Sequence, residues 1–323
     1  MKNHAFVFTV FFIASALLPL PDASLEQQQE DKPKPRHLEE VAYNESEEAL
    51  YLFGGVELID KKWQAAHGLY TFKNRWYLME ETGPVSRRGS TMVYNSKEMS
   101  MIVIGGVDGD SVLQDVWQCA NKEWKFIDAN CPLKEARAVY DVSKDRILVY
   151  GDAHNISSEW YGGDPRKFEL WEFKANTWRK LSDRGPEGPF PLTYDTRQES
   201  LSFLQWNESN QLALWQWKSD RWSMQTFDGN IPPPRNKYAF TYSKSQHALF
   251  LFGGIDSEKN LLADFWKYDG KQWIKLSIAN APSARASLKL VDAGERIFLY
   301  GGVTKEGITN ELWEFSNNQW KKK

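Results

Sequence analysis

Five pairs of tryptophans recur down this chain of 323 residues, and the two members of each pair lie seven positions apart. Four glycine pairs are separated from one another by multiples of about 50 residues, and each pair ends a short apolar run such as LFLFGG. The tryptophan pairs are Trp117 and Trp124, Trp171 and Trp178, Trp215 and Trp222, Trp266 and Trp273, and Trp313 and Trp320. The glycine pairs are Gly54 and Gly55, Gly105 and Gly106, Gly253 and Gly254, and Gly301 and Gly302. A repeat of this length indicates copies of one small unit that packs against its neighbours.

Other residues keep the same register. A tyrosine stands eleven positions before the first glycine, or before the residue that replaces it, in five copies, and Leu290 stands there in the sixth. The tyrosines are Tyr43, Tyr94, Tyr140, Tyr194 and Tyr242. Units three and four replace the glycine pair by Gly151-Asp152 and by Gln205-Trp206, so we expect irregular loops there. The six units can therefore be aligned with one another, and this alignment predicts six blades.

Within one unit the apolar residues recur with a period of two, which indicates strands. In the fifth unit the pattern predicts strands over 238–242, 248–253, 264–268 and 272–276. The second strand is apolar at nearly every position, as expected for a strand that neighbouring blades cover on both faces. We therefore predict an all-β, six-bladed propeller with four antiparallel strands per blade. The blades span about 36–82, 87–129, 132–183, 187–229, 235–279 and 285–323.

The repeat is similar to that of the kelch family. Residues 263–273, ADFWKYDGKQW, closely resemble the second half of a blade in the secreted, galactose-oxidase-like kelch proteins. The resemblance extends over about 36–323 and implies a kelch-type propeller. It implies less about function, because the family includes protein-binding modules, sialic-acid epimerases and copper oxidases.

The first residues differ in composition from the repeats. An apolar run over 5–20, followed by small residues, predicts a signal peptide over 1–24, with a retained signal anchor as the alternative. The polar segment 25–35 predicts a disordered linker. We thus expect a secreted, periplasmic or extracellular protein with no membrane span in the mature chain, and a monomer. The net charge of −3 argues against a nucleic-acid partner, because binding to nucleic acid depends on neutralising phosphates.

Two cysteines, Cys119 and Cys131, lie twelve positions apart. An oxidising compartment would allow them to form a disulfide. The other interpretation is that Cys119 occupies a buried apolar position, because Tyr268 and Phe315 stand there in other units. Both interpretations stay open at this stage.

One face of the predicted propeller carries the long connections between strands two and three, together with the connections from strand four to the next blade. The long loops cover about 56–68, 107–115, 152–169, 255–264 and 303–311. Such loops on a rigid scaffold commonly carry function. The candidate ligand-binding residues in them are Trp63 and His67 in the first loop, and His154, Trp160, Tyr161, Asp164 and Arg166 in the third.

Four arginines recur at the start of the inner strands on that face: Arg36, Arg87, Arg235 and Arg285. A ring of guanidinium groups would bind a carboxylate, such as that of an acidic peptide or a sialic acid. The alternative is that each arginine pairs with an acid two residues before a repeat tryptophan and joins the strands. Those acids are Asp115, Glu169, Asp264 and Glu311.

These patterns favour a non-catalytic scaffold that binds a protein or carbohydrate ligand. The alternative is a sugar-modifying enzyme that resembles the sialic-acid epimerases, with a copper oxidase much less favoured. Four histidines follow the predicted leader, at 37, 67, 154 and 247, and no close-spaced metal motif occurs. We expect no cofactor, no metal and no catalytic residue, and we interpret the tryptophan and glycine pairs as structural.

Overall fold

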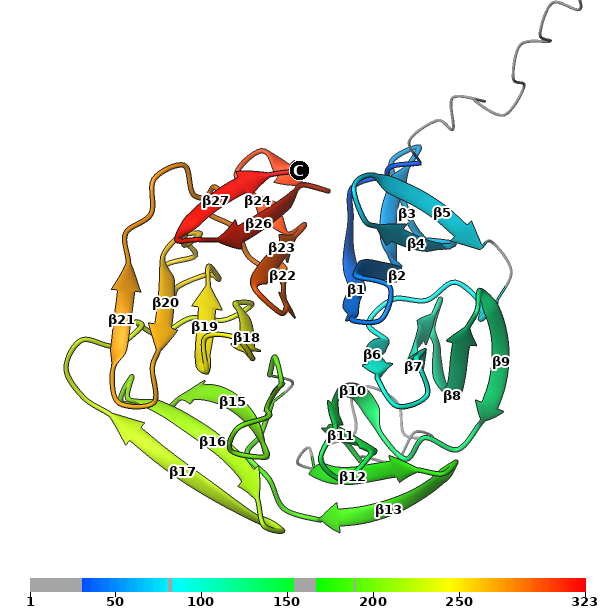
Figure 1. Cartoon of the computed structure of the whole chain (residues 1–323), viewed down its shortest axis with the longest axis horizontal. Coiled ribbons are helices and arrows are strands. Elements are labelled where there is room, and N and C mark those ends of the chain that lie inside the picture. The colour runs from blue at the N-terminus through cyan, green and yellow to red at the C-terminus, as the bar shows by residue number, and fades with distance from the viewer. Residues whose placement is uncertain (1–30, 81–82, 154–166, 189) are drawn as a thin grey trace, which may run out of the picture. The chain divides into compact units, whose positions relative to one another are not determined.

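The computed structural model describes residues 31–80, 83–153, 167–188 and 190–323. Within these ranges it contains strands and no α-helix, and six β-sheets stand radially around a common axis (Figure 1). The predicted six-bladed, all-β propeller is confirmed. No helix of the described residues is long and apolar enough to cross a membrane. The predicted signal peptide lies outside the described residues.

Each blade is an antiparallel meander whose strands follow chain order outward from the axis. Blade 1 contains β1 (Arg36–Asn44), β2 (Ala49–Ile59), β3 (Lys62–Ala65), β4 (Leu69–Phe72) and β5 (Trp76–Glu80). Blade 2 contains β6 (Thr91–Asn95), β7 (Ser100–Asp108), β8 (Ser111–Ala120) and β9 (Glu123–Asp128). Blade 3 contains β10 (Lys134–Asp141), β11 (Arg146–Asp152), β12 (Phe168–Lys174) and β13 (Thr177–Ser182).

The second half of the ring repeats the plan. Blade 4 contains β14 (Thr193–Asp195), β15 (Ser200–Trp206), β16 (Leu212–Lys218) and β17 (Arg221–Phe227). Blade 5 contains β18 (Ala239–Ser243), β19 (Ala248–Phe252), β20 (Phe265–Tyr268) and β21 (Trp273–Leu276). Blade 6 contains β22 (Lys289–Ala293), β23 (Arg296–Tyr300), β26 (Leu312–Ser316) and β27 (Gln319–Lys322), and a separate small hairpin joins β24 (Val303–Thr304) to β25 (Gly307–Ile308).

Blade 1 departs from the four-stranded prediction. Its β2 continues past the glycine pair and forms a hairpin with β3, in which Leu58 lies opposite Trp63. The predicted long loop is therefore partly a hairpin. Both side chains are more than half exposed, at 58% and 52%.

Apolar side chains fill each of the six junctions between neighbouring blades. The second strand of a blade contributes to two junctions at once, because alternate side chains point to opposite faces. On β19, Leu249 and Leu251 pack with blade 4, whereas Phe250 and Phe252 pack with blade 6. Because both faces of each second strand are buried, nearly every position in these strands is apolar.

The second tryptophan of each pair packs against the blade that precedes its own. Trp124 contacts Phe53 of blade 1, with ring centroids 5.4 Å apart. Trp273 lies 6.2 Å from Phe227 of blade 4, and Trp320 lies 5.9 Å from Phe252 of blade 5. These rings fill the outward-widening space between the sheets, where an indole removes more apolar surface from water than an aliphatic side chain.

Tight turns join the outer two strands, and their residues adopt positive φ. Asn317 and Asn318 have φ of 49° and 57°, Ser219 and Asp220 have 52° and 56°, and Gly270 has 92°. Paired positive φ angles match the right-handed twist of a hairpin. The predicted turn residues are confirmed.

The two cysteines do not form a disulfide with each other. Cys119 packs in the junction between blades 1 and 2, and Cys131 packs in the junction between blades 2 and 3. The structure therefore supports the interpretation of buried apolar positions. Burial raises the pKa of the Cys131 thiol to about 12, which keeps it protonated.

The ring closes without a sheet shared by the two ends of the described chain. The sheet of blade 1 holds β1–β5 and that of blade 6 holds β22, β23, β26 and β27, so the two ends of the chain share no sheet. Trp76 and Leu52 of blade 1 pack with Tyr300 and Phe298 of blade 6. An ion pair of 2.7 Å between Lys289 and Glu40 spans the same junction.

The glycine pair permits a close approach between blades. Gly253 has φ of 64°, and a Cβ there would lie 2.5 Å from the carbonyl oxygen of Arg285 in the next blade. Its neighbour Gly254 donates its N–H to that same carbonyl over 2.9 Å. A side chain at Gly253 would therefore force blades 5 and 6 apart.

We predict that Gly253→Ala lowers the free energy of unfolding by about 2 to 4 kcal/mol, through overpacking added to the strain of positive φ. The matched control is Gly270→Ala, which also has positive φ but meets no atom within 4 Å. Strain alone should cost about 1 kcal/mol there. Urea unfolding of both variants measures the difference, and equal losses would contradict the close-approach explanation.

Candidate binding site at the mouth of the channel

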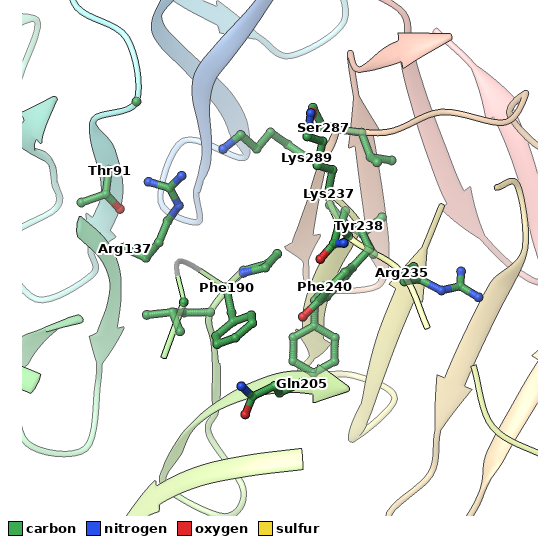
Figure 2. Close-up of a pocket in the computed structure, with 18 of the residues that line it drawn as sticks. Thr91, Arg137, Phe190, Gln205, Arg235, Lys237, Tyr238, Phe240, Ser287 and Lys289 are labelled. Atoms are coloured by element: carbon green, nitrogen blue, oxygen red, sulfur yellow. The ribbon is translucent and has the colours of Figure 1, made fainter. Parts of the chain in front are cut away.

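The recurring arginines form buried ion pairs within their own blades. Arg235 donates to both carboxylate oxygens of Asp264 at 2.5 and 2.8 Å, and to the carbonyl oxygens of Gly253 and Pro233 at 3.1 and 2.9 Å. The side chain of Arg235 is fully buried, and it points away from the central cavity (Figure 2). A two-point arginine–carboxylate pair of this kind fixes geometry as well as charge.

The same carboxylate accepts a hydrogen bond from the first tryptophan of the pair. Trp266 donates its indole N–H to Asp264 over 2.6 Å. Burial raises the pKa of Asp264, but the hydrogen bonds and charge of Arg235 lower it further, so the net pKa lies below its ordinary value. The carboxylate therefore stays ionised and joins β20 to the start of the inner strand.

This arrangement of arginine, carboxylate and tryptophan recurs with substitutions. Arg87 pairs with Asp115, which accepts from Trp117, and Arg285 pairs with Glu311, which accepts from Trp313. Arg36 pairs instead with Glu57 of its own blade. Blade 3 has no such arginine, and its Glu169 binds Lys167 and Lys180, each at 2.8 Å.

The geometry therefore favours the strand-joining interpretation for Arg36, Arg87, Arg235 and Arg285. Their side chains are fully buried, and each bonds a carboxylate together with the carbonyl of the first glycine of its blade. A guanidinium in this state has little remaining capacity for a ligand. The hydrogen-bonding groups of these four arginines are thus engaged within the fold.

A cavity of about 840 Å³ lies at the inner end of the blades. Residues from all six blades line it, because each inner strand begins at this face. Its apolar wall is formed by Phe190, Trp206 and Phe240. Its polar wall includes Gln205 and Ser287 (Figure 2).

Three basic side chains reach this cavity from different blades. Arg137 extends from β10 on one side, and Lys237 and Lys289 lie on the other side (Figure 2). Lys289 is paired with Glu40 at 2.7 Å. Among the described residues, neither Arg137 nor Lys237 has an ion-pair partner, and Arg137 donates to the carbonyl oxygen of Ala136 over 2.9 Å. Two cationic groups thus remain available to a ligand, and the acid Glu187 also lines the cavity.

The predicted residues of the first loop, Trp63 and His67, contact residues outside the lining of this cavity. Trp63 is half exposed and meets His37 edge to face, with ring centroids 4.9 Å apart. Burial and the charge of Lys237 lower the pKa of His37. His67 is exposed and bonds the hydroxyl of Ser86 at 2.7 Å. Trp63 and His67 do not line the cavity itself.

Residues 154–166 of the third loop lie outside the described part of the chain. The predicted ligand residues His154, Trp160, Tyr161, Asp164 and Arg166 lie outside the described residues. Their role stays a prediction. No group of three or more His, Cys, Asp or Glu side chains is arranged to hold a metal ion in the described part of the chain.

Sequence reasoning did not single out Arg137 or Lys237. Lys134 lies in the same strand as Arg137, and Arg235 lies two residues before Lys237, so neither residue stands out in its segment. Their proximity results from convergence of six blades on one axis, which no local spacing reveals. The positions equivalent to Arg137 in other blades hold residues of several types, namely Glu40, Thr91, Ala239 and Lys289, so the repeat itself gave no signal.

The fold and this cavity define a six-bladed propeller with a potential binding mouth on its axis. Residues 203–323 match the KLHDC2/KLHL20/DRC7 Kelch-repeats domain. The C-terminal part of the chain thus matches a kelch-repeat family model, and the described chain as a whole has the fold of a six-bladed β-propeller.

The proteins similar to this chain include a dynein chain and YjhT. Over 88 residues the chain is 33% identical to the dynein alpha chain of the flagellar outer arm from Chlamydomonas reinhardtii, a match that covers 26% of this chain and 2% of that protein. A solved structure described as the structure of YjhT superposes with a TM-score of 0.65 at 14% identity, covering 90% of this chain and 98% of that one. That likeness concerns the fold.

We predict that Arg235→Ala lowers the free energy of unfolding by about 3 to 5 kcal/mol, because it leaves Asp264 as a buried charge without its partner. The matched control is Arg137→Ala, which removes an arginine that has no carboxylate partner and should change stability by less than about 0.5 kcal/mol. Thermal and urea unfolding compare the two variants. Similar stability of both variants would contradict the strand-joining role.

Proposed function

We propose that this propeller is a secreted, non-catalytic scaffold that binds an acidic protein or carbohydrate ligand at the channel mouth. The observation that carries the proposal is the pair of cations, Arg137 and Lys237, which face a preformed cavity from opposite sides without carboxylate partners. An acidic group between them would gain charge-assisted hydrogen bonds at little cost in structural rearrangement.

The apolar wall supports a ligand with a flat or apolar part. Phe190 stacks on Phe203 with ring centroids 5.0 Å apart, and Trp206 packs on Tyr238 at 5.4 Å. The Trp206 indole N–H is also held by the carbonyl oxygen of Pro232 at 3.1 Å. Rings held in this way lose little conformational freedom when a ligand packs against them.

Secretion is supported by the sequence. The apolar run over 5–20 is followed by small residues suited to cleavage. The scaffold role is favoured over sugar chemistry because the described residues of the cavity offer cations and aromatic rings, the groups that hold a ligand. Catalysis on an acidic sugar remains the second candidate, since Glu187 lines the same cavity as a potential acid or base.

The test is a screen of acidic peptides and acidic glycans, each with a neutral analogue, followed by binding assays with variants. Arg137→Ala and Lys237→Ala should each weaken binding of the acidic ligand about tenfold or more, since a charge-assisted hydrogen bond contributes about 1.5 to 3 kcal/mol. Affinity should also fall with added salt. The melting temperature should stay unchanged, because neither side chain has an ion-pair partner to lose.

The matched control is Lys271→Ala, an exposed lysine in the turn between β20 and β21, away from the cavity lining. It should leave affinity unchanged. Equal affinity for acidic and neutral analogues, or binding that survives the double variant of Arg137 and Lys237, would contradict the proposed site. Turnover of an acidic sugar by the wild type would favour the enzymatic candidate.

A further inference from the structure

The junction between blades 6 and 1 contains a buried carboxyl group that has no counterpart at the equivalent junction between blades 5 and 6. Glu39 lies on β1 opposite Gly54 and is fully buried. Among the described residues, neither of its carboxylate oxygens has a hydrogen-bond partner. The hydroxyl of Tyr300, on the facing blade, also lacks a partner. Buried polar groups without partners are rare in folded proteins, so this pair calls for an explanation.

Comparison with the neighbouring junction shows what Glu39 replaces. Between blades 5 and 6, a side-chain methyl of Leu288 lies 3.5 Å from the position of a Cβ on Gly253. Between blades 6 and 1, Oε1 of Glu39 lies 3.0 Å from the corresponding position on Gly301. Leu288 and Glu39 both stand three residues after the recurring arginine. A carboxyl group thus occupies the place of an aliphatic side chain.

This junction also lacks a backbone contact that two others have. Gly55 and Gly254 donate their N–H groups to the carbonyls of Arg87 and Arg285 in the next blade, at 2.8 and 2.9 Å. No corresponding bond from Gly302 to Arg36 occurs in the described structure. Because blades 1 and 6 share no sheet, the ring is completed here by side-chain packing and by side-chain polar contacts such as the Lys289–Glu40 ion pair.

The charged groups around Glu39 are already engaged. Arg36 on the same strand is paired with Glu57 of β2, and it lies over the ring of Tyr70 at 4.9 Å. On the facing blade, Lys289 of β22 is paired with Glu40 at 2.7 Å. These groups act on Glu39 at a distance but do not bond it, and Tyr300 of β23 supplies a neutral hydroxyl nearby.

Burial raises the pKa of Glu39 to about 7, although the charge of Lys289 opposes this shift. A folded-state pKa above the ordinary value of 4.5 means that the folded chain binds the proton more tightly than the unfolded chain. The stability associated with the neutral carboxyl is therefore fully present below pH 4.5 and is lost as the pH rises to about 7.

We propose that Glu39 is a proton-controlled latch of the ring: its neutral form allows blades 6 and 1 to pack closely, and its ionised form loosens this junction. The neutral carboxyl can donate a hydrogen bond within the junction, to the Tyr300 hydroxyl or to a buried water. The carboxylate has only acceptor capacity and no charged partner. The propeller is thus tightest in mildly acidic surroundings and opens preferentially at this junction above neutrality.

The experiment measures amide hydrogen exchange of the whole chain between pH 5 and pH 8, corrected for the intrinsic pH dependence of exchange. The latch predicts that protection of β1 and β23 falls with rising pH, relative to β11 and β15 on the far side of the ring. Glu39→Gln keeps the shape of the side chain but cannot ionise, so protection in this variant should not change between pH 5 and pH 8 beyond what other groups cause.

Urea unfolding gives the second readout. A pKa change from 4.5 to about 7 corresponds to on the order of 100-fold in the folding equilibrium constant, which Glu39→Gln should recover at pH 8. Asp292, on β22 of blade 6, also has a pKa raised by burial to about 7. Its contribution to the pH dependence of stability is present in both the wild type and Glu39→Gln, so it cancels when the two are compared.

Two control variants separate the latch from general effects of the junction. Glu40→Gln removes the adjacent carboxylate, and Tyr300→Phe removes the hydroxyl. Both should keep the pH-dependent loss of protection, because each retains Glu39. Wild-type protection that is equal at β1 and β15 across the pH range would overturn the proposal. So would a Glu39→Gln variant with the same pH dependence as the wild type.

Discussion

The structure depends on apolar packing between sheets that have no core of their own. Each second strand is buried on both faces, and each face belongs to a different junction, as Leu251 and Phe250 show in blade 5. A single four-stranded blade removed from its neighbours would expose both of these faces to water. Burial of apolar area, the main favourable contribution to folding, is therefore gained only when blades assemble.

Polar contacts then fix how the sheets approach one another. The buried arginine, carboxylate and tryptophan join strands at the inner face, and the glycine pair brings neighbouring backbones together. Committing these arginines to structure leaves the channel mouth to other side chains. Arg137 and Lys237 reach it from repeat positions whose residue type differs between blades, so the candidate site is built from side chains that the repeat does not fix.

Most of the fold was predictable from the sequence, because tryptophan and glycine spacing and a two-residue apolar period are local signals. The strands of blade 5 were predicted to within about one residue of their observed ends. The extra hairpin of blade 1 was missed, since Leu58 and Trp63 resemble a loop when taken singly. The role of Arg235 was ambiguous because a basic residue has the same spacing whether its guanidinium faces a channel or a buried aspartate. Convergence on the axis, which creates the cavity, depends on the closed ring and is not visible in any one segment.

The most direct test of the account is whether the ring unfolds as one unit. Equilibrium urea unfolding should be followed by tryptophan fluorescence, by far-ultraviolet circular dichroism, and by hydrogen exchange resolved along the chain. If each blade is stable only through its two junctions, the two optical transitions should coincide. At urea concentrations near the midpoint of these transitions, hydrogen exchange in the second strands of all six blades should report the same free energy of unfolding. Separate transitions, or a single blade that keeps its protection after its neighbours unfold, would contradict the claim that the sheets have no independent core.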